Sequence, residues 1–283
     1  MKSDFSFDNN QISAINKYLR NKDGLIFFVC SPKYEKYIEP LYLSLKIYAP
    51  EWLKLLIKVG FLNNNSSNRC EMTMNININS ETLNDQDFNI KNFSANIRAP
   101  LLNFFCKNLD TNKIIYVDVD TLLIKDLSYA IKNFPNNKKI FLRSVSKTFY
   151  QVVKDSNNYM PFKSGVILIK TDNNKYLRND NDILDFTKSY QYLCWSQKNK
   201  WFADQEGLLY VFENKIKLKR FLFTSYKLCD WYFLPTSIFW AAKGSIKNQI
   251  IWKVNCFIIK IIHNKIFNKS KKYCSKFYFL FYK

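Results

Sequence analysis

Short apolar runs alternate along the chain with segments whose apolar residues recur at helical spacing. Five runs have the length and the β-branched or aromatic content of buried strands, and they lie at residues 25–30, 53–61, 114–117, 139–143 and 165–170. Helical spacing is found at residues 37–48, 90–109, 183–193 and 204–212. A late apolar run at residues 258–262, directly before His263, predicts one more strand. This alternation predicts an α/β fold with a mostly parallel, Rossmann-like central sheet flanked by helices, in one domain.

Two aspartates, Asp118 and Asp120, follow the strand predicted at residues 114–117. Two like charges at the end of a buried strand are costly, because burial and mutual repulsion both disfavour the ionised forms. Alternate residues of a strand share a face, so both carboxylates can reach one divalent cation. In open α/β sheets the carboxyl ends of the strands bind ligands. We therefore predict a metal site that holds a phosphorylated substrate.

The charge balance points to an anionic partner. The chain has 43 Lys and Arg against 23 Asp and Glu, a net charge of +20, which suits a nucleotide, a nucleic acid or an anionic membrane. Codon bias of an AT-rich genome explains the same balance, since Lys, Asn, Ile, Phe and Tyr are all abundant. The seven cysteines include no Cys-x-x-Cys pair, so neither a disulfide framework nor a zinc site is predicted. Reduced thiols and a start without a secretory signal favour a cytoplasmic location.

The last segment, residues 269–283, alternates basic and aromatic residues. This pattern suits a peripheral anchor on the inner face of a membrane, with rings at headgroup depth and lysines on anionic lipid. An ordinary helix or strand that packs on the domain is the equal alternative. The apolar stretch at residues 250–262 is interrupted by lysine and asparagine, and we expect it to be too short and too polar to span a bilayer.

Several segments resemble family 8 of the GT-A fold glycosyltransferases, which includes bacterial lipopolysaccharide galactosyl- and glucosyltransferases and the glycogenins. Residues 116–121 (Tyr-Val-Asp-Val-Asp-Thr) resemble the Asp-x-Asp motif, and residues 162–166 (Phe-Lys-Ser-Gly-Val) resemble the Asn-Ser/Ala-Gly-Val segment. Residues 204–206 (Asp-Gln-Glu) resemble the Asp-Gln-Asp segment, and residues 261–263 (Ile-Ile-His) resemble a late strand that ends in a metal-binding histidine. The matches keep the order of the family over residues 25–270.

Two further matches concern the nucleotide-sugar. Residues 95–98 resemble a segment whose arginine lies near the donor, and residues 25–31 with Tyr34 resemble the first strand and its nucleotide-binding loop. The chain also departs from the family. Lys163 replaces an asparagine, and Ile266 replaces the glycine found three residues after the histidine. The family's Lys-Pro-Trp, six residues after the histidine, is Lys-Ser-Lys at residues 269–271.

The resemblance implies a GT-A domain over residues 1–268 and roles for individual residues. It implies a Mn²⁺ site, with Mg²⁺ as the weaker choice, formed by Asp118, Asp120 and His263. It implies that Asp204 contacts sugar hydroxyls and that Gln205 lies near the anomeric carbon, as the catalytic pair. The implied contacts to the nucleotide-sugar are Cys30, Ser31, Tyr34, Arg98, Asp118, Val119, Ser164, Gly165 and Lys269.

Several of these residues have a structural alternative. Asp204 before a helical run is also a common helix cap, and His263 by itself suits a structural role. Arg98 and Lys269 can also be surface charges; in so basic a chain this is the better explanation of any single lysine, so the role of Lys269 rests on the family spacing alone. Gly165 precedes an apolar strand in a chain with only 5 glycines, so it needs a reason such as close packing or a positive φ.

The expected function is metal-dependent transfer of a hexose, from UDP-glucose or UDP-galactose, to a hydroxyl of a glycan or glycolipid, with retention. Three alternatives stay open: a nucleic-acid-binding or a membrane-binding protein on a degenerate glycosyltransferase fold, and a sugar nucleotidyltransferase. The last usually has a glycine-rich phosphate loop after its first strand, and residues 30–34 contain no glycine. Nucleic acid is not the expected partner, because binding to it would not explain two aspartates that end a buried strand.

Overall fold

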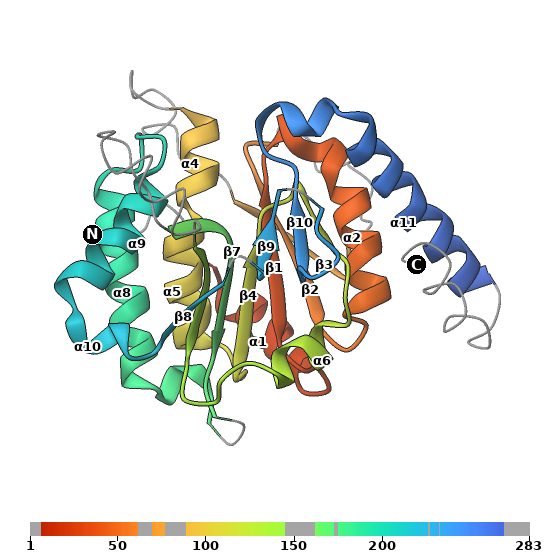
Figure 1. Ribbon diagram of the computed structural model, residues 1–283. Helices are drawn as coiled ribbons and strands as arrows, with labels where there is room; N and C mark the ends of the chain where they lie inside the picture. Colours follow the sequence, from red (N-terminus) through yellow and green to blue (C-terminus); the bar gives the residue numbers. More distant parts are fainter. Residues whose placement is uncertain are drawn as a thin grey trace.

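The computed structural model describes residues 7–61, 70–76, 89–144, 162–172, 175–225, 227–231 and 233–268. Its centre is a seven-stranded sheet with the order β3-β2-β1-β4-β7-β6-β8 (Figure 1). The strands are β1 (Leu25–Cys30), β2 (Leu53–Val59), β3 (Met72–Ile76), β4 (Lys113–Val117), β6 (Ile140–Ser144), β7 (Phe162–Lys170) and β8 (Leu222–Thr224). All neighbours pair in parallel except β7, which runs antiparallel to β4 and β6. The predicted α/β fold with a mostly parallel sheet is confirmed.

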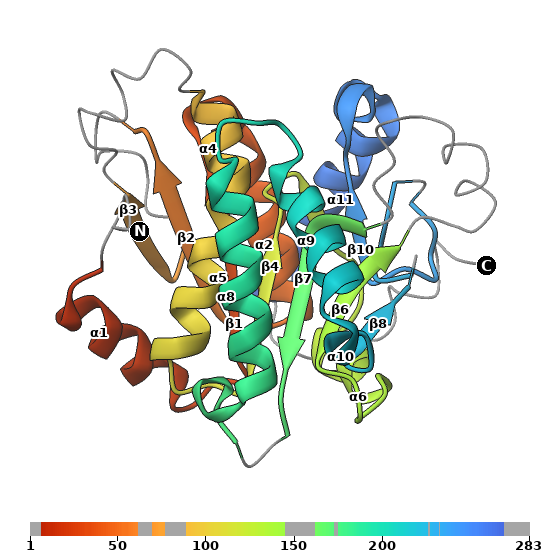
Figure 2. The same cartoon turned by 90° about the vertical axis from the view of Figure 1, so that its left-hand side faces the viewer.

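Helices cover both faces of this sheet, which is why apolar side chains dominate the inner strands. One face packs against α1 (Asn9–Leu19), α4 (Ile90–Asn96), α5 (Arg98–Asn108), α8 (Asn181–Ser196) and α9 (Ala203–Asn214). The other face packs against α2 (Ile38–Tyr48) and α6 (Leu127–Lys132). The two helical layers lie on opposite sides of the strands in Figures 1 and 2. All six residues of β1 are buried between them.

A small second sheet continues from β4 and carries the late part of the chain to the site. It has the order β5-β10-β9, with β5 (Thr121–Leu123), β9 (Cys229–Asp230) and β10 (Phe239–Ala241). Shorter elements connect the rest: η1 (Pro32–Tyr37), η2 (Leu177–Asn179), α10 (Ile216–Lys219) and η3 (Gly244–Asn248). Because β5 follows Asp120 at once, this sheet brings β10 next to the two aspartates.

The strand predicted at residues 258–262 is wrong, because these residues belong to the helix α11 (Ile250–Asn268). Trp252 and Ile259 are buried with Leu122 and Ala242, and α11 lies along the outer side of α2 (Figure 1). The outward face of the helix is also apolar. Because both faces of the helix are apolar, its apolar residues follow one another in the sequence, and such a run resembles a buried strand.

Candidate active site

The carboxyl ends of the parallel strands and the start of β7 meet at one edge of the large sheet. Asp118 follows β4 directly, and its backbone N–H donates to the carbonyl of Gly165 in β7 (2.8 Å). A cavity of about 350 Å³ opens here. Its lining consists of Ala95, Arg98, Asp118, Arg143, Lys163, Ser164, Gly165, Val166, Trp201, Phe202, Asp204, Gln205, Cys229, Trp231, Ala241, Lys243 and Gly244. The structure thus brings together Arg98, Asp118, Ser164, Gly165, Asp204 and Gln205 from the sequence prediction.

Arg98, at the start of α5, connects the strand ends to α9. Its Nη2 lies 3.2 Å from Asp118 Oδ1, and its Nη1 lies 3.2 Å from Asp204 Oδ2. Nη1 also donates to the carbonyl (2.8 Å) and the hydroxyl (3.0 Å) of Ser164. Burial opposes the charge of Arg98, but the carboxylates outweigh burial and raise its pKa above the ordinary value. With 5% of its surface exposed, Arg98 is no surface charge.

Asp204 and Gln205 lie in the first turn of α9, where Asp204 does not act as a cap. The N-cap residue is Phe202, in the left-handed region (φ 72°), and it makes no side-chain cap hydrogen bond. The carboxylate of Asp204 instead accepts a hydrogen bond from the Ser164 hydroxyl. Gln205 Oε1 accepts a hydrogen bond from Lys163 Nζ (3.3 Å). Both side chains therefore line the cavity, and neither caps the helix.

Gly165 is required by the close approach of β7 to Asp118. A β-carbon at this position would lie 2.9 Å from Asp118 Oδ2 and 3.5 Å from Lys243 Nζ. The first contact is too short for a carbon and a carboxylate oxygen, and Asp118 is held by its other partners. Close packing is thus the reason for this glycine.

Two lysines from the segment after β10 neutralise the aspartates. Lys243 Nζ forms an ion pair with Asp118 and lies 3.4 Å from Asp120 Oδ1. Lys247 Nζ lies 2.6 Å from Asp120 Oδ2. Burial by itself would raise the pKa of Asp118, but Arg98 and Lys243 hold it well below its usual range. The same attraction outweighs burial at Lys243 and raises its pKa.

These contacts do not fit the predicted metal site of Asp118, Asp120 and His263. His263 lies in α11, which packs on α2, and not at the end of a strand. Burial and the positive charge of Lys46 in α2 lower the pKa of His263. Over the ranges that the structure describes, no three His, Cys, Asp or Glu side chains lie close enough to hold one ion. The charged partners of the aspartates are Lys243, Lys247 and Arg98.

The strand that reaches the aspartates is β10. It pairs antiparallel with β5, with Ala241 opposite Thr121. The backbone N–H of the next residue, Ala242, donates to the carbonyl of Asp120 (2.9 Å). This pairing fixes the end of β10 beside the aspartates, where the family's late strand was expected.

The spacing that the family's pattern has after its histidine is also found after β10, at residues 241–249. Gly244 follows Ala241 by three residues and has a φ of 55°, which favours glycine, and Lys247 follows by six. In this comparison Ala241 stands where the family's pattern has histidine, and Asn-Gln at residues 248–249 stands where it has Pro-Trp. The predicted match to His263 relied on an apolar run that is helical in the structure.

The loop after β1 lies beside the aspartates but outside the lining of the cavity. The carbonyl of Ser31 accepts a hydrogen bond from the N–H of Tyr34 (2.9 Å). Lys247 Nζ, which pairs with Asp120, lies 4.5 Å from the centroid of the Tyr34 ring. Burial raises the pKa of Cys30 to about 12, so its thiol stays protonated at neutral pH. Tyr34 thus approaches the site through Lys247, while Cys30 is part of the core.

The remaining predicted contacts are Val119 and Lys269. Val119 is buried in the core between the large sheet, α2 and the small sheet. Lys269 lies outside the described residues, as does the rest of the basic-aromatic segment 269–283.

Three cationic residues of the site were missed from the sequence: Lys243, Lys247 and Arg143. The guanidinium of Arg143 lies 4.2 Å from the ring centroid of Trp231 at the cavity. One signal was present, because Gly244 is one of only 5 glycines and follows a short apolar run. Nothing comparable distinguishes Arg143 from the other basic residues.

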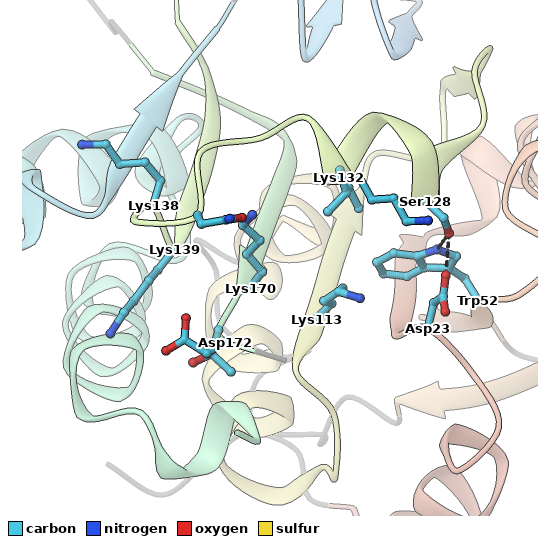
Figure 3. A pocket seen from close by; sticks show the side chains of 12 residues that line it. Asp23, Trp52, Lys113, Ser128, Lys132, Lys138, Lys139, Lys170 and Asp172 are labelled. Carbon is cyan, nitrogen blue, oxygen red and sulfur yellow. Dashed lines mark hydrogen bonds between the residues drawn. The ribbon is translucent and has the colours of Figure 1, made fainter. Parts of the chain in front are cut away.

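A larger cavity, of about 440 Å³, opens at the opposite edge of the sheet (Figure 3). Lysine side chains surround it, among them Lys113 at the start of β4 and Lys170 at the end of β7. On one side, Trp52 donates to the hydroxyl of Ser128 (3.1 Å), which donates to Asp23. None of the predicted site residues that the structure describes lines this cavity.

Comparison with solved structures identifies the fold. The glycosyltransferase GlyE of Streptococcus pneumoniae TIGR4 aligns with 14% identity and a TM-score of 0.55, and its apo form with 13% and 0.53. Each alignment covers 88% of this chain and 64% of the GlyE chain, so the present chain spans less than two thirds of GlyE. The chain has the GT-A fold. The galactosyltransferase LgtC, solved with donor and acceptor sugar analogs, aligns with 14% identity and a TM-score of 0.47 over 87% of this chain and 98% of its own. No family model and no curated protein matches the chain.

Proposed function

We propose that this protein is a glycosyltransferase that moves a hexose from UDP-glucose or UDP-galactose to a hydroxyl of a glycan or glycolipid, with retention at the anomeric carbon. The observation that carries the proposal is the cavity at the carboxyl ends of the strands, in a chain with the GT-A fold. Ligands of open α/β sheets bind at this edge. The cavity combines cations with carboxylate and amide groups, which suits a donor that has a diphosphate and a sugar.

The cations support the diphosphate part of the proposal. Arg143, Lys163 and Lys243 line the cavity together with Arg98. Burial lowers the pKa of Lys163, and the positive charge of Arg143 lowers it further. An anion between these side chains would relieve both effects, since it returns a favourable partner to each charge.

Asp204 and Gln205 support the sugar part of the proposal. A carboxylate and an amide recognise hydroxyl groups through directed hydrogen bonds. Gln205 is neutral and a poor nucleophile, so the proposed route is a front-face attack. The bond from the anomeric carbon to the diphosphate oxygen breaks, and its electron pair leaves with the diphosphate. The acceptor oxygen forms the new bond on the same face, and its proton goes to the departing diphosphate.

Contact with an anionic membrane is the proposed setting for a glycolipid acceptor, and α11 supports it. Its exposed apolar side chains are Ile250, Ile251, Val254, Phe257 and Ile261. Lys253 and Lys260 lie on the same helix. Apolar residues beside lysines are typical of helices that lie in a membrane interface. In the part of the chain that the structure describes, no helix is long and apolar enough to cross a membrane.

The test is a thermal-shift panel of UDP, GDP, CDP and ADP, each with Mn²⁺, with Mg²⁺ and with EDTA. A ligand that binds only the folded state raises the melting temperature by mass action. We expect UDP to give the largest shift and UDP-glucose or UDP-galactose to be consumed when acceptor is added. A cooperative melt that none of the four nucleotides moves would contradict a nucleotide-sugar donor.

Two matched variants locate the binding site, because both cavities are basic. Arg143→Met removes a cation from the proposed site, and Lys132→Met removes one from the larger cavity. We expect the first to reduce the UDP shift and the second to leave it unchanged. The reverse result would move the nucleotide to the opposite edge of the sheet.

A further inference from the structure

The carboxylates of Asp118 and Asp120 are already neutralised by side chains of the chain itself. Lys243 contacts both, Lys247 lies 2.6 Å from Asp120, and Arg98 lies 3.2 Å from Asp118. The side chains of Asp118 and Asp120 are only 15% and 7% exposed. A buried carboxylate pair needs positive charge nearby, and here the charge comes from ammonium and guanidinium groups.

The backbone places these lysines, so they are not surface side chains that happen to reach inward. Lys243 comes two residues after β10, which is held beside the aspartates by its pairing with β5. Gly244, with its positive φ, turns the chain into η3, and Lys247 follows one turn later. The strand β10, the turn at Gly244 and the short helix η3 therefore place the ammonium groups of Lys243 and Lys247 beside the two carboxylates.

This arrangement excludes the usual coordination of a divalent cation. An ion at the aspartates would need the carboxylate oxygens that the lysines contact, and it would meet two positive charges within ion-pair distance. Ala241, at the position that matches the family's histidine, offers only a methyl group. The disagreement with the implied metal site is thus built into three positions: 241, 243 and 247.

We propose that Lys243 and Lys247 take the place of a divalent cation, and that the site binds the diphosphate of a nucleoside diphosphate through Lys243 without metal. An ammonium group has three N–H donors. Asp118 and Asp120 use two donors of Lys243, and its side chain is 32% exposed at the cavity, so the third can reach a phosphate oxygen. Lys247 is a positioning residue that holds Asp120 against the Tyr34 loop. The inference rests on the proposed function for the identity of the ligand.

The first test needs no variant and no nucleotide. The wild-type protein is titrated with MnCl₂ alone, and binding is followed by calorimetry and by the melting temperature. We expect no saturable binding below about 1 mM. Saturation at micromolar Mn²⁺ would overturn the proposal, whatever the donor proves to be.

The second test measures UDP binding in EDTA and in Mn²⁺ for the wild type and three variants. We expect equal affinity in both buffers, and a loss of about tenfold or more in Lys243→Met, because a hydrogen bond to a charged group is removed. Lys243→Arg should restore much of the affinity, since it keeps a cation. Lys188→Met, an exposed position on α8, is the matched control and should bind as the wild type does.

Removal of the Lys243 ammonium group should also change the affinity for Mn²⁺, which would not happen if Lys243 only supported the fold. Lys243→Met leaves carboxylate oxygens open to an ion, so we expect it to bind Mn²⁺ at least about tenfold more tightly than the wild type. Lys247→Met provides a second variant of the same kind if the first does not melt cooperatively. UDP binding that requires Mn²⁺ in the wild type would overturn the proposal. If no nucleotide binds in either buffer, the proposed function fails, while the titration with MnCl₂ still decides the role of the lysines.

Discussion

Replacement of Arg98 by alanine should lower the free energy of unfolding by about 3–5 kcal/mol, the usual result of breaking a buried ion pair. Arg98 is 5% exposed and pairs with Asp118 and with Asp204, which is 4% exposed. In the variant, Asp118 keeps Lys243, whereas the carboxylate of Asp204 keeps the Ser164 hydroxyl and no ion-paired cation among the residues that the structure describes. The loss therefore comes mainly from a buried carboxylate without a cation.

The matched control is Arg178→Ala, which breaks an ion pair of the same type on the surface. Arg178 lies 2.7 Å from Asp110, but the side chains are 42% and 36% exposed. Water and salt screen such a pair, so its removal should cost less than about 1 kcal/mol. Urea unfolding followed by circular dichroism gives both values. For a chain of this size, the melting temperature should fall by about 6–20 °C for Arg98→Ala and by under about 4 °C for Arg178→Ala.

Equal costs for the two variants would refute the reasoning, because burial is the main difference between the pairs. Arg98→Lys should lower the free energy of unfolding by less than Arg98→Ala does. Lysine keeps the positive charge, but it cannot pair with Asp118 and Asp204 at once as the guanidinium does.

Three further predictions concern Gly165 and Asp118 in the proposed site and the exposed face of α11. Gly165→Ala should cost about 1–3 kcal/mol of stability through its clash with Asp118, and should weaken the thermal shift by UDP; an unchanged shift would contradict the close approach. Burial raises the pKa of Asp118, but the neighbouring cations lower it by more, so it lies below the pKa of about 3.9 in the unfolded chain. The ionised Asp118 therefore contributes its full stabilisation above about pH 3.9, and this stabilisation is lost as the pH falls through the pKa of the folded state. The stability difference between wild type and Asp118→Asn should thus be constant from about pH 8 to 5 and shrink below about pH 4 in urea titrations; shrinkage already near pH 6 would count against it. Replacement of Val254 and Phe257 by serine should reduce sedimentation with anionic vesicles without a change in melting temperature, because both side chains are exposed.

The sequence by itself determined the sheet and the place of the aspartates. A strand covered by helices on both faces is mostly apolar, so β1, β4 and, apart from Lys54 and Lys58, β2 are visible as apolar runs. Asp118 and Asp120 follow β4 in the chain, and the carboxyl end of that strand is at the ligand-binding edge of the sheet. The resemblance to the glycosyltransferase family also predicted that Arg98, Ser164 and Asp204 belong to one site.

Only the tertiary structure decided which groups neutralise the aspartates. Lys243 is 125 residues from Asp118, and no local pattern distinguishes it among the 43 basic residues. It reaches the site because β10 pairs with β5, a contact that depends on three residues in each strand. Strands so short have no clear signature. The long apolar helix α11, in contrast, has a strong sequence signature, but this signature indicates a strand. The hydrophobicity of a residue shows that its side chain is apolar, and it does not show which neighbour covers that side chain.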